Sequence, residues 1–208
     1  MRIEALTAEE ITQVHEAALD ALAEIGMQLP SSSPLADRLR EAGLEITADD
    51  RLRLPRAVVE AAVERAPRTV QLGTRNPSRK VVLDRSRTYA TTDGCGGNTI
   101  DLESGRVRPA VLTDVAASAR LTDALDGYDV YWVMVSAQDV PLASRVPREC
   151  LTALQNTTKH VQMIDVSRPS EARLLVRMAR ELQDAGVIEE PPVSMLISSS
   201  PVCRCLPL

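Results

Sequence analysis

Asp139 is the strongest candidate for a catalytic carboxylate in this chain. It follows the apolar run 131–135, which has the composition of a β-strand. In a βα barrel, catalytic groups lie where strands end and loops begin, on the carboxyl-terminal face. A carboxylate at this strand exit would point into the barrel mouth. The same position also suits a helix cap or a turn residue, and the sequence leaves both roles open.

The run Gly94-Cys95-Gly96-Gly97 is the second feature that bears on function. Glycine lets the backbone approach a ligand closely, so the run could line a binding site. Residues of strand type follow it, whereas the dinucleotide-binding fingerprint requires a helix there. A tight loop between two strands explains the same residues, and the residues alone favour this simpler interpretation.

Two further groups of residues could carry chemistry and also have simpler explanations. His160 could act as an acid or base and Lys159 could pair with an anion, but both lie at the start of a strand, on the stability face of a barrel. Tyr128, Tyr131 and Trp132 could surround a methylated ammonium group, or they could pack in the core. The four cysteines form no CxxC pair and the chain has two histidines, so we expect no metal site.

The elements that must position these residues recur with an almost constant period. Three strand-like runs contain Met134, Ile164 and Ile197, which are 30 and 33 residues apart. This spacing accommodates a strand, a helix and their two loops. The predicted fold class is therefore α/β, a partial TIM (β/α)8 barrel of about its first half. Ten residues follow Ser198, too few for a covering helix, so we expect a truncated barrel.

The residues before the barrel pattern predict two further parts. Residues 1–68 form an N-terminal helical segment, which opens with a Thr7 and Glu10 capping box and a helix that ends before Gly26. Residues 69–208 begin with strand-like segments and a hairpin pattern around Gly105. We expect a short antiparallel β-sheet there, which leads into the truncated barrel.

Composition and charge exclude several classes of protein. The net charge is −5 and the arginines are scattered, which argues against a nucleic-acid partner. No apolar stretch approaches the length of a membrane span, and the N-terminus lacks the features of a signal peptide. We therefore expect a cytoplasmic protein with no membrane or nucleic-acid partner.

A set of short motifs follows one order along most of the chain. The opening helix presents Ile11, Val14, His15, Ala18, Leu19, Leu22, Ile25 and Gly26. The later motifs are Glu41-Ala42-Gly43, Leu54-Pro55, Ala66-Pro67, Arg75-Asn76-Pro77, the glycine-rich run with Asp101, Arg108-Pro109, Thr113-Asp114, residues 156–160 and Ser199-Ser200-Pro201. Together they resemble the trimethylamine methyltransferase family, the corrinoid-dependent amine and betaine methyltransferases. After Pro201 the sequence departs from the family pattern, which suggests a prematurely ended reading frame.

The resemblance implies a definite chemistry. A methyl group would pass from a methylated amine or betaine to the Co(I) of a corrinoid (cobalamin) carried by a partner protein, with no cofactor bound by this chain itself. The cationic substrate requires carboxylates or aromatic faces. On that basis Asp139 is assigned as catalytic, and Asp93, Gly94, Gly96, Gly97 and Asn98 as substrate-binding.

Three alternatives remain open from the sequence. The chain could be an inactive fragment of such an enzyme, or an active enzyme completed when half-barrels self-associate as a homo-oligomer. It could also be an unrelated, non-catalytic α/β binding module.

Overall fold

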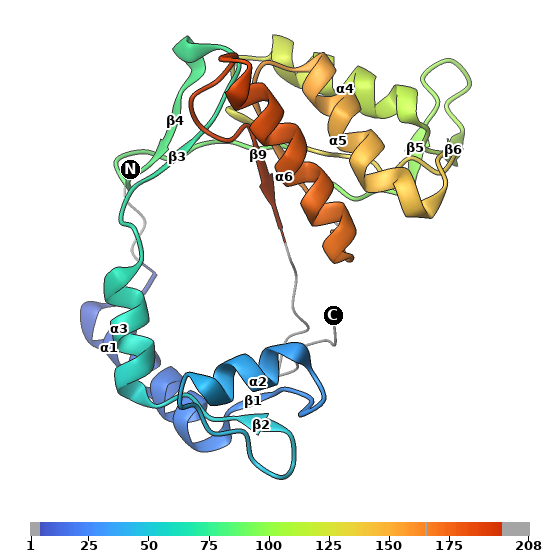
Figure 1. Cartoon of the computed structure of the whole chain (residues 1–208). Helices are drawn as coiled ribbons and strands as arrows, with labels where there is room; N and C mark the ends of the chain where they lie inside the picture. Colours follow the sequence, from blue (N-terminus) through green and yellow to red (C-terminus); the bar gives the residue numbers. More distant parts are fainter. Residues whose placement is uncertain (1–4, 165, 197–208) are drawn as a thin grey trace. The chain divides into compact units, whose positions relative to one another are not determined.

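A computed structural model describes residues 5–164 and 166–196 (Figure 1). The backbone contacts divide the chain into two compact units, and the boundary along the sequence lies between Pro67 and Arg68. The chain is mixed α/β, with several small sheets, and the described residues form no closed barrel. The two units are described separately below.

The first unit opens with the helix that the capping box predicts. Helix α1 (Ala8–Asp20) begins after Thr7, whose hydroxyl accepts a hydrogen bond from Glu10 N while the Glu10 carboxylate accepts one from Thr7 N. The helix continues as a π-helical turn (Ala21–Ile25) and ends at Gly26, which has φ +71°. A side chain at Gly26 would come within 2.5 Å of the Leu52 carbonyl oxygen, so glycine is required by both the backbone angle and the close approach.

The rest of the first unit is a small helical layer with a two-stranded sheet. Its elements are α2 (Pro34–Glu41), α3 (Arg56–Arg65) and the antiparallel pair β1 (Met27–Gln28) and β2 (Arg51–Leu52). A small core of Leu29, Ala36 and Leu52 joins α2 to the strands. Arg56 at the start of α3 pairs with Glu16 and Asp20 on α1, and these ion pairs connect the two helices.

The second unit begins with two separate antiparallel hairpins, where the sequence predicts one short sheet. Strands β3 (Val70–Leu72) and β4 (Val81–Leu83) form the first, and a 3₁₀ turn (Pro77–Arg79) lies between them. Strands β5 (Asn98–Ile100) and β6 (Val107–Pro109) form the second. Its turn contains Gly105 at φ +68°, as the hairpin pattern predicts.

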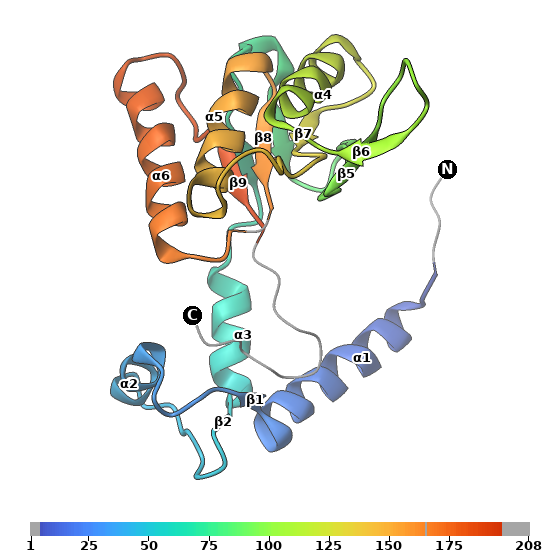
Figure 2. The same ribbon diagram turned by 90° about the vertical axis from the view of Figure 1, so that its right-hand side faces the viewer.

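A three-stranded parallel sheet and its helices complete the second unit. The strands are β7 (Val130–Trp132), β8 (His160–Met163) and β9 (Val193–Met195), in that order. The helices are α4 (Leu112–Ala124), α5 (Arg145–Asn156), which a 3₁₀ turn (Leu142–Ser144) precedes, and α6 (Pro169–Asp184). Figures 1 and 2 show α4, α5 and α6 side by side over one face of this sheet. The βα rhythm predicted from the sequence is therefore present.

The strands divide their side chains between two faces. Tyr131, Val133, Val161 and Met163 enter the main hydrophobic core with residues of the three helices. Because side chains alternate along a strand, Trp132, Gln162 and Ser194 occupy the opposite face, in one row across the sheet. Among the described residues, no helix is long and apolar enough to cross a lipid bilayer.

Candidate functional site

The glycine-rich run lies beside β7 as a fourth parallel segment. Thr91 bridges to Val130 and Gly96 bridges to Val135, both in parallel orientation. At the amino end of the segment, the Ala90 carbonyl accepts hydrogen bonds from Asp129 N and Val130 N. The run is thus an edge segment of the parallel sheet and not the tight loop between strands that the residues alone favoured.

The approach of this segment to β7 explains one of its glycines. A Cβ atom on Gly94 would overlap the Cα atom of Met134 and lie 2.5 Å from the Val133 carbonyl oxygen. The regular backbone ladder is replaced here by the Thr92 hydroxyl, which accepts from Trp132 N at 2.9 Å and donates to Trp132 O at 2.7 Å. Glycine at position 94 is therefore a packing requirement.

The loop after β7 joins the glycine-rich segment at the carboxyl end of the sheet. Ser136 N donates to the Gly96 carbonyl at 2.9 Å, and Gln138 N donates to the Ala110 carbonyl at 2.7 Å. Ala110 N in turn donates to the Gly97 carbonyl at 3.1 Å. Three segments distant in sequence are therefore held together by backbone hydrogen bonds.

Asp139 lies in this assembly as an exposed carboxylate. Its Oδ1 atom accepts a hydrogen bond of 2.9 Å from Leu112 N, the first residue of α4. The carboxylate therefore satisfies one of the free N–H groups at the helix start and is favoured there by the helix dipole. Asp139 thus bonds the start of a helix distant in sequence and does not begin a helix of its own. The second carboxylate oxygen makes no hydrogen bond to the described residues.

The other predicted site residues lie on the segment that pairs with β7 or directly after it. The Asp93 carboxylate is exposed and accepts from the neighbouring Gly94 N at 2.8 Å. Asn98 is exposed at the start of β5, where it pairs with Pro109. The structure thus gathers residues 93–98 and Asp139 into one region, although no direct contact joins the side chains of Asp93, Asn98 and Asp139.

Glu149 is a residue of this region that the sequence analysis missed. It lies on α5 and is only 4% exposed, and its Oε1 atom accepts a 2.6 Å hydrogen bond from Ala137 N. Buried carboxylates need such partners. A sequence indication existed, because Glu149 occupies the apolar face of α5 with Val146 and Ala153.

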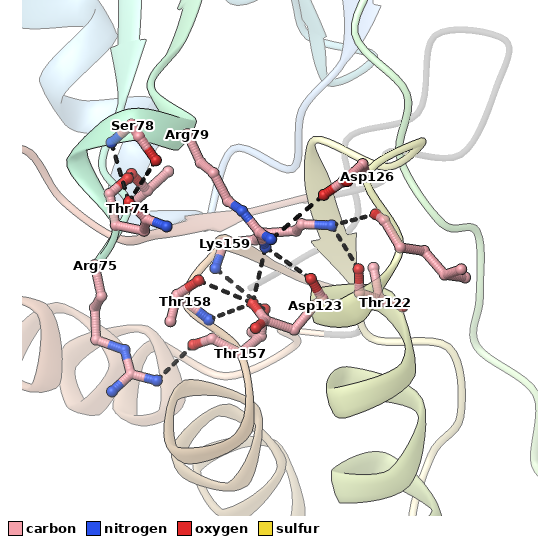
Figure 3. Close-up of polar contacts among 12 residues, drawn as sticks. Thr74, Arg75, Ser78, Arg79, Thr122, Asp123, Asp126, Thr157, Thr158 and Lys159 are labelled. Atoms are coloured by element: carbon pink, nitrogen blue, oxygen red, sulfur yellow. Dashed lines mark hydrogen bonds and ion pairs between the residues drawn. The ribbon is translucent and has the colours of Figure 1, made fainter.

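At the opposite, amino end of the strands, residues 157–159 have structural roles (Figure 3). The Asp123 carboxylate accepts from the Thr157 hydroxyl at 2.9 Å and from Thr158 N at 2.7 Å. Burial opposes its charge, but the hydrogen bonds from Thr158 and Thr157, together with Arg79, lower the pKa of Asp123 overall. Lys159 is 2% exposed and donates to the Thr122 and Leu125 carbonyls at the end of α4.

His160 also has a structural role. Its Nδ1 lies 3.0 Å from the Gly73 carbonyl oxygen, and its Nε2 lies 2.9 Å from the Ser194 hydroxyl. Because a carbonyl can only accept, Nδ1 carries the proton and Nε2 accepts from Ser194. Burial lowers the pKa of His160. The ring therefore links β8 and β9 to the first hairpin, as its position at the start of a strand indicates.

The three aromatic residues considered for an ammonium site do not form one cluster. Tyr131 is fully buried on the helix side, where its hydroxyl contacts the Ser118 hydroxyl at 2.9 Å, and burial raises its pKa. Trp132 faces the opposite side of the sheet, and its buried indole N–H has no partner among the described residues. Tyr128 lies before the amino end of β7. Core packing therefore explains Tyr131, whereas Trp132 remains on the face away from the helices.

Comparison with known proteins decides the family. The model of the family described as Trimethylamine methyltransferase (MTTB) matches residues 1–203. The chain belongs to the trimethylamine methyltransferase family. The resemblance stated from the motifs is thereby confirmed.

Curated relatives are 26% to 29% identical to the chain over the residues that align. It is 29% identical over 172 residues to trimethylamine methyltransferase MttB of Desulfitobacterium hafniense, which covers 82% of this chain and 34% of that protein. MttB of Methanosarcina thermophila is 28% identical over 175 residues, or 76% and 34% of the two chains. A glycine betaine methyltransferase of Desulfitobacterium hafniense is 26% identical over 155 residues, or 74% and 32%. The chain spans about a third of the length of these relatives.

Proposed function

We propose that this chain supplies part of a corrinoid-dependent methyltransferase that binds a methylated amine or betaine. The observation that carries the proposal is the family match over residues 1–203, together with relatives named for trimethylamine and for glycine betaine. The chain spans about a third of the length of those relatives. That the chain itself catalyses methyl transfer is therefore also proposed.

The geometry of the second unit supports this function. Three parallel strands and the segment 90–96 run side by side, with helices on one face. We propose that this arrangement is part of a (β/α)8 barrel, whose inner face carries Trp132 and Gln162. The glycine-rich segment and Asp139 then lie at the carboxyl edge, where barrel enzymes place their sites.

In the proposed reaction this chain positions a cationic substrate. The Asp139 carboxylate is exposed and held in place by Leu112 N, and its unbonded oxygen can face an ammonium group. Asp93 adds a second negative charge at the same edge. When the partner's corrinoid is bound, its Co(I) supplies the nucleophile for the methyl group. The contribution of this chain is binding and orientation.

A direct test is methyl transfer by the purified chain. We expect the visible spectrum of a reduced corrinoid partner protein to change when a methylated amine is added with the chain, and to stay constant without it. Trimethylamine and glycine betaine are compared in parallel, since relatives of both kinds match the chain. No spectral change with either substrate, at high concentrations of chain and substrate, would contradict independent activity.

The role of Asp139 can be separated from its capping role by the change Asp139→Asn. The amide oxygen still accepts from Leu112 N, so stability should change by less than about 0.5 kcal/mol. The lost charge should weaken binding of a methylated ammonium compound by about 3- to 5-fold, as expected for an exposed ion pair. Binding is measured by calorimetry or by the fluorescence of Trp132, the chain's single tryptophan.

Asp184→Asn is the matched control, because Asp184 is an exposed carboxylate at the end of α6, at the other edge of the sheet. It should leave binding unchanged. Equal affinities for wild type and Asp139→Asn would remove Asp139 from the proposed site.

Binding without turnover is the second candidate function. The observation that favours it is the coverage of about a third of the relatives. Under this alternative, the fluorescence or calorimetric titration succeeds while the corrinoid spectrum stays constant.

A further inference from the structure

A charged cavity lies at the amino end of the strands, away from the candidate site. Its volume is about 170 Å³, and its lining includes Arg79, Lys80, Arg87 and Lys159. The sequence has two lysines among 24 basic residues, and both of them line this one cavity. Both lysine ammonium groups of a chain with net charge −5 therefore lie at one site, which suggests an anionic ligand.

Two acidic residues, Asp126 and Asp129, also line this cavity, and Asp123 pairs with Arg79 beside it. Asp129 accepts from the Arg87 guanidinium at 2.8 Å and from Ala90 N at 2.8 Å. Asp123 accepts from Thr157, from Thr158 and from Arg79. Asp129 and Asp123 are therefore each paired with an arginine before any ligand binds.

Asp126 completes the set of nearby acidic groups. It lies 3.6 Å from Arg79, and its side chain is 97% exposed (Figure 3). Water therefore screens its charge strongly. Arg79 and Arg87 are matched by these carboxylates, whereas the two lysines have no carboxylate within ion-pair distance among the described residues. The cavity is thus electropositive.

Lys159 retains an available donor. Its ammonium group has three N–H bonds, and two of them donate to the Thr122 and Leu125 carbonyls at 2.5 and 2.7 Å. These two carbonyls hold the ammonium group in place at the cavity that it lines, and no third acceptor for it is present among the described residues. Burial and the neighbouring Arg79 lower the pKa of Lys159, whereas the Asp123, Asp126 and Asp129 carboxylates partly oppose this shift. An anion bound directly beside the ammonium group would oppose it further.

We propose that this cavity binds a small oxyanion of the phosphate class through Lys159 and Lys80. Lysine binds phosphate as a point charge, and both lysines line this cavity. A volume of about 170 Å³ equals roughly five or six waters at about 30 Å³ each. A phosphate ion or the terminal phosphate of a small metabolite fits this space.

The two lysines make a test possible on the unmodified chain. Amine-reactive acylation followed by mass spectrometry of the Lys80 and Lys159 peptides reads both side chains in one sample. We expect inorganic phosphate to slow acylation at both sites, when compared with chloride at equal ionic strength to hold screening constant. Glycerol phosphate in a parallel arm distinguishes a phosphate monoester from the free ion as the ligand.

Substitutions of the two lysines measure how much each contributes to phosphate affinity. Lys80 is exposed, so Lys80→Gln should fold normally and weaken phosphate binding in calorimetry by about 3- to 5-fold, the size of an exposed ion pair. Lys159→Met should weaken it by about 10-fold or more, because a buried charged donor is lost. Arg106→Gln removes a charge from an exposed hairpin position outside the cavity lining and should have no effect.

Two outcomes would overturn the proposal. One is an acylation rate that phosphate and glycerol phosphate leave equal to the chloride control. The other is phosphate binding that is identical in wild type and Lys80→Gln. Both results concern the amino end of the strands, so they are independent of whether methyl transfer is observed.

Discussion

At the scale of single residues, the burial of His160 gives it a structural role. Its ring is 1% exposed and makes a hydrogen bond at each nitrogen, to Gly73 and to Ser194. A residue type often associated with proton transfer is here a neutral crosslink between two strands and a hairpin. Its protonation in the folded state costs free energy because the charge would lose its hydration.

This burial predicts a pH dependence of stability. The folded pKa of His160 is lowered from 6.5, so below about pH 6.5 the unfolded chain takes up a proton that the folded chain refuses. The stabilisation is therefore complete above pH 6.5 and declines as the pH falls, by up to about 1.4 kcal/mol per pH unit. Urea denaturation between pH 8 and pH 5 measures the decline.

His160→Asn is the variant that isolates this effect. Asparagine keeps a donor for the Gly73 carbonyl and cannot be protonated, so the decline below about pH 6.5 should become shallower. His15→Asn is the control, because His15 is the other histidine of the chain and is exposed on α1. If His160→Asn and wild type lose stability in parallel, another group causes the decline.

At the scale of elements, the start of α4 is held by carboxylates from two sources. Asp114, in its first turn, accepts from Val111 N at 2.9 Å and pairs with Arg108 at 2.7 and 2.8 Å. The pairing with Arg108 lowers the pKa of Asp114. Asp139 accepts from Leu112 N. The helix begins at Leu112, and the carboxylates of Asp114 and of the distant Asp139 satisfy N–H groups at its start.

The pairing of the glycine-rich segment with β7 gives an element-scale prediction. Gly94→Ala places a methyl group against the backbone of Met134 and Val133, and neither backbone can yield without separating the segment from the strand. We expect a loss of about 1–3 kcal/mol in the free energy of unfolding, measured by urea denaturation.

Gly127→Ala is the matched control for this change. A Cβ atom on Gly127 would have no neighbour within 4 Å, and its φ lies outside the left-handed region. Its stability should stay within about 0.5 kcal/mol of wild type. A loss of similar size in both variants would show that the close approach at Gly94 is not the cause.

At the scale of the whole molecule, the chain consists of two compact units joined between α3 and β3. Residues 66–69, which connect these elements, are all exposed. Exposed connections with few hydrogen bonds are the preferred sites of proteolysis. Arg65 directly precedes this connection and Arg68 lies in it, and trypsin cleaves after arginine.

Brief digestion with trypsin should therefore cut first after Arg65 or Arg68. Mass spectrometry should show two fragments that persist while the intact chain disappears. The double variant Arg65→Gln, Arg68→Gln should delay the first cut. Initial cleavage elsewhere, for example after the exposed Arg106 in the second hairpin, would contradict a connection of this kind.

The sequence by itself determined the local elements and the family. The Thr7 and Glu10 cap, the hairpin at Gly105 and the period of strands and helices depend on residues that are near neighbours along the chain. The ordered motifs that resemble the trimethylamine methyltransferases depend on order and spacing alone. The local elements are visible in the sequence because the interactions that form them join near neighbours along the chain. The family is visible because the order and spacing of its motifs can be read directly from the sequence.

Tertiary structure decided which distant residues meet. The glycine-rich run is an edge segment because its backbone pairs with β7. The bridge between Thr91 and Val130 joins residues about 40 positions apart in the sequence. Glu149 reaches Ala137, and Lys80 lies with Lys159 around one cavity. These contacts follow from strand order and helix packing, which no local pattern encodes. The sequence could therefore name Asp139 as a candidate, while only the fold showed that its carboxylate also caps α4.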